Sequence, residues 1–302
     1  VVMKGLMVGR TAKSRAAAVK RYGQGLGRFT EPAVIKALEW LRDNQNSDGS
    51  WAKDGTGRGN VGYTGLALLT FLAHGETPSS AEFGTTVGRG IRYIIEDQNS
   101  DGTFRNSGSH QSYGHAMATY ALAEAYTMTE NPLLAEPVRK GVDVMIRGQM
   151  PNGGYDYNYK LENRNDLSVG AWQVQAMKAA SISPANSPRL EEYKQKGMDG
   201  IMEGAVKRQD GSINFTYKVN VGENASGMNR TVSAAGSLCL FLAGRGGTSQ
   251  ADDAIDFLET FLEPGEIPDW GNDDGGTSHG GRINIWYYAV QAFFQDNPDG
   301  TN

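Results

Sequence analysis

The chain repeats a stretch that reads KALEWLRDNQNSDGSW at residues 36–51, RGIRYIIEDQNSDGTF at 89–104 and KGVDVMIRGQMPNGGY at 140–155. In each copy a basic residue stands nine positions before a glutamine. A glycine follows four positions after the glutamine, and an aromatic residue two positions later. A fourth copy at 196–213 carries about two extra residues, and a fifth around 253–262 lacks the glutamine and the glycine. A period of about 50 residues indicates a repeat architecture in which each copy is one supersecondary unit.

Each unit contains two helices of different character. The first is amphipathic, because Val34, Leu38 and Leu41 fall on one face with charged residues between them. The second contains no Asp, Glu, Lys or Arg, and its windows are 63–73, 113–123, 167–177, 231–243 and 283–295. A helix that is apolar or small on all sides is buried on all sides. The alternation predicts an all-α chain forming an α/α toroid (barrel) of five to six helix pairs, with the charged helices in an outer layer.

The alternative to a closed barrel is an open solenoid. It would leave one helix set with a solvated concave face, which the uncharged windows disfavour. Small residues would let the inner helices approach one another closely; they are Gly65, Gly114, Gly170, Ala234, Gly236 and Ala289.

The chain divides by composition into a basic segment at residues 1–28 and a toroid domain at residues 29–302. The first segment is rich in Lys and Arg, with no acidic residue before Glu31. We expect either a basic helix that docks on the acidic domain and completes a sixth pair, or an arm that binds a membrane surface or a partner.

The Gln-x-x-x-Gly-x-aromatic repeats resemble the QW motif of the squalene–hopene cyclase and protein prenyltransferase superfamily. Within that superfamily, the chain more closely resembles bacterial proteins described as prenyltransferase and squalene oxidase repeat proteins, through stretches such as 113–134, 166–180 and 285–294. The resemblance covers roughly residues 29–302 and implies an α–α toroid. It says little about the reaction, since toroid folds host several unrelated functions.

The catalytic motifs of that superfamily are missing from this sequence. No Asp-x-Asp-Asp run, with which the cyclases protonate their substrate, occurs in it. The prenyltransferases hold zinc with an Asp-x-Cys pair and a distant His, but Ser237 precedes Cys239 here and the last inner window reads Ile285-Trp286-Tyr287-Tyr288. We therefore expect no zinc and no other cofactor. Residues 97–108 begin like the calcium-binding loop of an EF-hand, but Gly108 stands where that loop requires a Glu. The stretch is better explained as a turn.

The remaining polar and aromatic groups on the inner helices predict a site. Parallel inner helices would bring their N-terminal ends, with free N–H groups, to one mouth of the barrel. His115 and Asp166 are candidate catalytic residues, and we expect Asp166 to pair with an arginine or histidine across the mouth. The candidate ligand-binding residues are Tyr63, Tyr113, Trp172, Arg230, Arg282, Trp286 and Tyr287. Each has a structural alternative: Asp166 as a helix N-cap, His115 as a buried hydrogen-bonded ring, and the aromatic residues as packing.

Three functions fit these observations. The first is a toroid that binds an apolar or isoprenoid-like small molecule or lipid in its central cavity. The second is an enzyme of other chemistry in the same funnel, such as a polysaccharide lyase or hydrolase. The third, least favoured, is a protein-interaction module.

Composition limits the partners and the compartment only in part. The net charge of −5 disfavours nucleic acid, the single cysteine excludes an internal disulfide, and no window is long and apolar enough to predict a transmembrane segment. The sequence leaves open the oligomeric state and the compartment, whether cytoplasmic or exported after removal of a leader.

Overall fold

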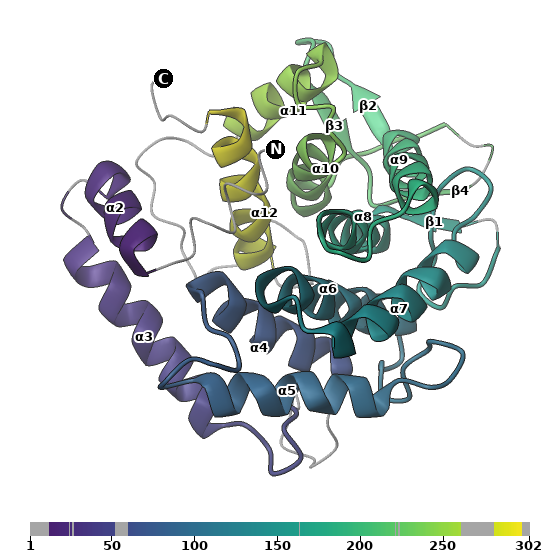
Figure 1. Ribbon diagram of the computed structural model, residues 1–302. Helices are drawn as coiled ribbons and strands as arrows, with labels where there is room; N and C mark the ends of the chain where they lie inside the picture. Colours follow the sequence, from purple (N-terminus) through teal and green to yellow (C-terminus); the bar gives the residue numbers. More distant parts are fainter. Residues whose placement is uncertain are drawn as a thin grey trace. The chain divides into compact units, whose positions relative to one another are not determined.

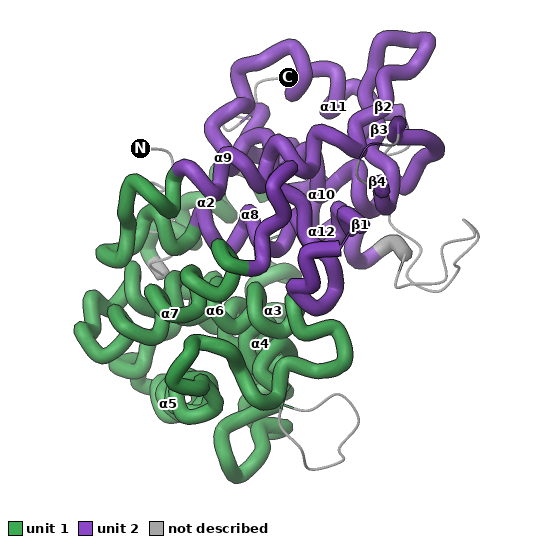
Figure 2. The backbone as a smooth tube through the Cα atoms, turned by 90° about the vertical axis from the view of Figure 1, so that its right-hand side faces the viewer, with its two compact units in different colours: residues 1–147, 179–191 green, residues 148–178, 192–302 purple. Residues whose placement is uncertain are grey.

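The computed structural model describes residues 12–23, 25, 27–51, 60–162, 164–220, 222, 224–260 and 281–297. The chain divides into two compact units (Figure 2): residues 1–147 with 179–191, and residues 148–178 with 192–302. None of the described helices is long and apolar enough to cross a membrane.

Helices alternate along the chain as the repeats predict (Figure 1). The charged helices are α3 (Gly27–Asp43), α5 (Gly84–Asp97), α7 (Ala135–Arg147), α9 (Pro188–Met202) and α11 (Ser249–Glu259). The uncharged windows form α4 (Val61–His74), α6 (Gln111–Thr129), α8 (Leu167–Ile182), α10 (Arg230–Leu242) and α12 (Gly281–Asp296). A further helix, α2 (Ala12–Tyr22), precedes α3, and a short 3-10 helix, η1 (Pro132–Leu134), precedes α7.

Within each unit the uncharged helices lie side by side. In the first unit α4 packs along α6, and α5 packs against both. In the second unit α10 packs along α12, and α11 packs against both. The two helix types therefore form two layers in each unit, as their charge patterns predict.

Glycines bring α4 and α6 into close contact. A Cβ added to Gly62 would lie 2.9 Å from Cα of Gly114, and one added to Gly65 would lie 2.7 Å from the carbonyl oxygen of Met117. Positions three apart on α4 thus face positions three apart on α6 in the same order, so the two helices are parallel. This confirms the role predicted for Gly65, whereas the Cβ position of Gly114 itself faces the backbone of Ser107. Gly236 has another neighbour, because its Cβ position faces the ring of Phe215.

The repeat motif joins one outer helix to the next. The motif glycines have left-handed backbones (φ 87° to 92°), and their missing Cβ atoms would clash with the carbonyl of the basic residue that opens the next copy; the pairs are Gly49 with Arg89, Gly102 with Lys140 and Gly153 with Lys196. The motif glutamines donate to the carbonyl three positions before that basic residue; the pairs are Gln45 with Thr86, Gln98 with Pro137 and Gln149 with Tyr193, at 3.0 to 3.1 Å. These residues therefore hold the repeats together.

Two short sheets depart from the all-α prediction. β1 (Arg164–Asp166) pairs antiparallel with β4 (Lys218–Asn220), and β2 (Ala205–Lys207) pairs antiparallel with β3 (Ile213–Phe215). The β2–β3 hairpin occupies the fourth copy of the repeat, where extra residues extend the turn. The same turn in the second copy makes only the single bridge between Gln98 and Phe104.

The predicted buried face of α3 is only partly correct. Leu38 is buried, whereas Val34 is 43% exposed and Leu41 is half-buried. α3 is the first helix of the repeat array, and among the described helices it packs on α4.

Candidate functional site

Asp166 lies at the start of α8 and forms an ion pair with Arg164. The carboxylate is fully buried, and Nε and Nη2 of Arg164 donate to its oxygens at 2.7 to 2.9 Å. The amide of Asp166 donates to the carbonyl of Tyr155 at 2.7 Å. The pairing expected for Asp166 is therefore present, but its arginine lies two residues earlier on β1 and not across a barrel mouth.

Two tyrosines extend this ion pair toward the surface. The guanidinium of Arg164 lies 5.0 Å from the ring centroid of Tyr157, whose hydroxyl is hydrogen-bonded to that of Tyr217. Tyr217 is 37% exposed, and its carbonyl accepts from the amide of Leu167 at 3.1 Å. We call Tyr157, Arg164, Asp166 and Tyr217 the polar cluster. It joins the connection before α8 to the connection before α10, which also meet through β1 and β4.

Burial controls the protonation of the polar cluster. Desolvation raises the pKa of Asp166, and the hydrogen bonds from Arg164 oppose that rise. Burial also raises the pKa of Tyr157 above its usual range, with a further contribution from the hydrogen bond to Tyr217. Nearby Asp156 accepts from the amides of Asn158 and Lys160 at 2.8 and 2.9 Å. Both carboxylates are thus engaged by donors of the chain.

A cluster of aromatic rings lies farther along α8. Trp172 stacks on Tyr287 of α12 with ring centroids 5.8 Å apart and an interplanar angle of 22°. Tyr288 meets both rings edge-on, at 6.2 Å from Trp172 and 4.9 Å from Tyr287. The structure therefore brings together Trp172 and Tyr287, as predicted. Trp286, another predicted ligand-binding residue, is half-buried on the same helix as Tyr287.

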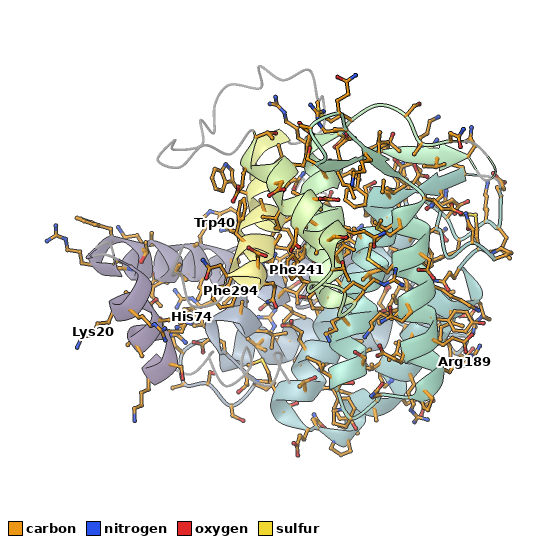
Figure 3. The ribbon with its side chains drawn as sticks, turned by 90° about the horizontal axis from the view of Figure 1, so that it is seen from above. Lys20, Trp40, His74, Arg189, Phe241 and Phe294 are labelled. Atoms are coloured by element: carbon orange, nitrogen blue, oxygen red, sulfur yellow. The ribbon has the colours of Figure 1, made fainter. Side chains whose placement is uncertain are left out.

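An exposed apolar stripe continues from Tyr287 along α12. Its four members, spaced as one helix face, are 37% to 59% exposed: Ile283, Tyr287, Val290 and Phe294. Phe294 is labelled on the yellow helix in Figure 3. Because these side chains lie on one helix face, the stripe is a candidate binding surface.

His115 packs against an outer helix. It is buried, its Nε2 lies 2.8 Å from the carbonyl oxygen of Gly141 on α7, and its ring is 5.0 Å from that of Phe104. Burial lowers the pKa of His115 to about 4. A neutral ring that donates to a backbone carbonyl matches the structural alternative predicted for His115.

The other predicted residues lie in different parts of the chain. Tyr63 and Tyr113 occupy the first turns of the parallel helices α4 and α6, at the same end of the first unit; Tyr63 is 39% exposed and Tyr113 half-buried. Arg230 is an exposed first residue of α10 in the second unit. Arg282 lies in the first turn of α12, and its side chain is outside the described residues.

No metal site is found among the side chains that the structure describes, where no three His, Cys, Asp or Glu residues gather. Cys239 is buried, and burial raises its pKa well above the usual range of a thiol. Ser237 donates to the carbonyl of Ser233 at 2.9 Å. In the EF-hand-like stretch at 97–108, the carboxylate of Asp101 accepts from the hydroxyl and the amide of Thr103 at 2.7 and 3.0 Å, so this carboxylate closes a turn.

A cavity of about 560 Å³ opens beside β2 in the second unit. Glu203, Lys207 and Asn224 are among its lining residues, and its described lining includes no aromatic side chain and none of the predicted site residues.

Comparison with known proteins supports the assignment of the fold. Residues 17–135 match the squalene-hopene cyclase C-terminal domain family. This match covers less than half of the chain, and it supports the α/α toroid fold that the repeats predict. A squalene–hopene cyclase of Bradyrhizobium diazoefficiens is 33% identical over 25% of this chain, and the aligned part spans only 12% of that protein.

Solved structures of other α/α toroids are similar in fold at low sequence identity. They include an α-1,6-mannanase from Salegentibacter sp. (14% identity, TM-score 0.65, covering 89% of this chain and 81% of that one). A cellobiose 2-epimerase from Bacillus thermoamylovorans has 11% identity and a TM-score of 0.59, covering 87% and 77%. An endo-β-1,4-glucanase from Acetobacter xylinum has 13% identity and a TM-score of 0.56, covering 88% and 98%. At these identities the likeness concerns the fold alone.

Sequence reasoning did not find three members of the polar cluster: Tyr157, Arg164 and Tyr217. A signal was present in the tyrosines at alternate positions 155, 157 and 159, and in the long connections before α8 and α10.

Proposed function

We propose that this squalene cyclase-like toroid binds an apolar, isoprenoid-like ligand and that the aromatic rings of α8 and α12 form part of the site. The observation that carries the proposal is the stack of Trp172 on Tyr287, which continues into the exposed apolar stripe of α12. Aromatic walls with an open apolar face suit a hydrocarbon chain.

The physical driving force is burial of apolar surface. Each Å² of apolar surface removed from water contributes roughly 25 cal/mol. The stripe from Ile283 to Phe294 extends about 16 Å along the helix at about 1.5 Å per residue. A flexible chain lying on it would cover apolar surface that is now exposed on α12.

The proposal includes no cyclisation and no zinc-dependent transfer. The sequence lacks the Asp-x-Asp-Asp run, and Ser237 stands where the prenyltransferase motif has an Asp. The carboxylate of Asp166, the candidate acid, has both oxygens held by Arg164.

Titration with farnesol, an isoprenoid alcohol, tests the proposal. We expect saturable quenching of tryptophan fluorescence in the wild type and at least about tenfold weaker binding in Tyr287→Ala, because an anchoring aromatic is often worth about 2 kcal/mol. Trp40→Ala is the matched control, since Trp40 is an exposed aromatic on α3 in the other unit. Equal affinity of wild type and Tyr287→Ala would place the ligand elsewhere.

The second candidate function is an enzyme of other chemistry acting on a carbohydrate. It is favoured by the glycan-active neighbours of the same fold and by the half-exposed polar cluster, with two phenols and a guanidinium at the surface. Release of reducing ends from α-1,6-mannan or β-1,4-glucan, abolished in Asp166→Asn, would establish this function over the first.

A further inference from the structure

His74, the last residue of α4, is buried between two carboxylates. Its Nδ1 lies 2.8 Å from Oε1 of Glu76, which follows the helix, and its Nε2 lies 3.3 Å from Oε1 of Glu31 on α3. Figure 3 labels His74 close to the purple helices at the start of the chain.

The neutral and the protonated forms of the His74 ring satisfy these two contacts differently. A neutral imidazole has one N–H and one lone pair, so it donates to one carboxylate and turns its other nitrogen toward the oxygen lone pairs of the second. The imidazolium has two N–H groups and donates to both. With both glutamates ionised, only the protonated ring satisfies the geometry observed.

Helix α2 is attached at the same point. Nη1 of Arg15 donates to the carbonyl oxygen of His74, and Nη2 lies 3.4 Å from Oε1 of Glu31. Among the described residues, the charged groups that contact the ring or its carbonyl are thus Glu31 from α3, Glu76 from the loop after α4 and Arg15 from α2.

We propose that protonated His74 is a pH-dependent latch that holds the basic helix α2 to the end of α4. Protonation ties Glu31 and Glu76 to one ring, and this fixes the carbonyl and the carboxylate that Arg15 contacts. Loss of the proton as the pH rises leaves an unsatisfied contact at the ring and loosens α2. The latch lies in the first unit and is independent of the proposed ligand.

Hydrogen exchange of residues 12–22, followed by mass spectrometry at about pH 5.5 and about pH 8.5, tests the latch on either side of the ordinary titration range of histidine. After correction for intrinsic exchange rates, we expect protection of α2 to fall about tenfold at the higher pH, the effect of losing one charge-assisted hydrogen bond. Equal corrected protection at both pH values would overturn the proposal.

Glu76→Gln is the discriminating variant. A glutamine amide can donate to Nδ1 of a neutral ring whose Nε2–H donates to Glu31, so protection should stay high at both pH values. A drop as large as in the wild type would contradict the latch. Glu136→Gln, which removes the partner of Lys140 on α7, is the charge-matched control and should keep the wild-type pH dependence.

Discussion

Two starts of uncharged helices, those of α6 and α8, use their polar residues in opposite ways. His115 in α6 follows a short connection, turns toward the outer helix α7 and donates to one backbone carbonyl. Asp166 before α8 follows a long connection, lies in a short sheet with β4 and is paired with Arg164. The second region places Tyr157, Arg164 and Tyr217 near the surface. The regular repeat therefore provides packing, and the longer connections provide the ion pair and the tyrosines of the polar cluster.

The largest expected effect concerns the regular repeat. A Cβ at Gly153 would lie 1.8 Å from the carbonyl oxygen of Lys196 in a left-handed backbone (φ 87°). Gly153→Ala should therefore lower the free energy of unfolding by about 4 kcal/mol, measured by urea denaturation. Gly211→Ala is the matched control, because Gly211 has the same backbone region (φ 93°) with nothing within 4 Å, and should cost about 1 kcal/mol. Similar losses in the two variants would show that the repeat contact is unimportant.

The ion pair of the polar cluster gives the next effect. Asp166→Ala removes a fully buried carboxylate from a pair whose arginine side chain is 41% exposed, and it should lower the free energy of unfolding by about 2 kcal/mol, between the effects of breaking an exposed and a buried pair. Asp143→Ala removes an exposed partner of Arg189, at 3.6 Å, and should cost less than about 1 kcal/mol. If both variants unfold at the same urea concentration, the pair of Asp166 contributes no more than a surface pair.

His115 predicts a pH dependence of stability in the first region. Its pKa is lowered to about 4 in the folded state, so the unfolded chain binds the proton first and stability is lost as the pH falls from about 6.5 toward 4. The loss between neutral pH and about pH 4.5 should be about 2 kcal/mol larger in the wild type than in His115→Gln. Parallel pH profiles of the two proteins would mean that the ring is solvated.

Much of the fold could be predicted because a repeat period and a charge alternation are properties of the sequence itself. The side of α6 that His115 occupies could not be predicted, because the window 113–123 has no charged residue and therefore no polar face that would set the rotation of the helix. The partner of Asp166 could not be predicted either. β1 and β4 are more than fifty residues apart, and their pairing depends on how two long connections meet. The sequence predicted that Trp172 and Tyr287 lie near each other, but it did not predict that their rings stack.

The smallest expected effect is at the edge of the polar cluster. Tyr217→Phe removes the hydroxyl that is hydrogen-bonded to Tyr157 and should lower the free energy of unfolding by about 1 kcal/mol. Because the pKa of Tyr157 is raised by burial and by this bond, its ultraviolet titration should begin at a lower pH in the variant. An unchanged titration would show that burial alone accounts for the shift.

Native mass spectrometry of freshly purified protein tests the central claim most directly. The account predicts that a fraction of the wild type carries a bound lipid-sized adduct, that fragmentation releases an isoprenoid-like molecule, and that Tyr287→Ala carries less of it than Trp40→Ala. A wild-type protein that carries no adduct and takes up none from added farnesol, or one whose bound molecule is a sugar, would contradict the account.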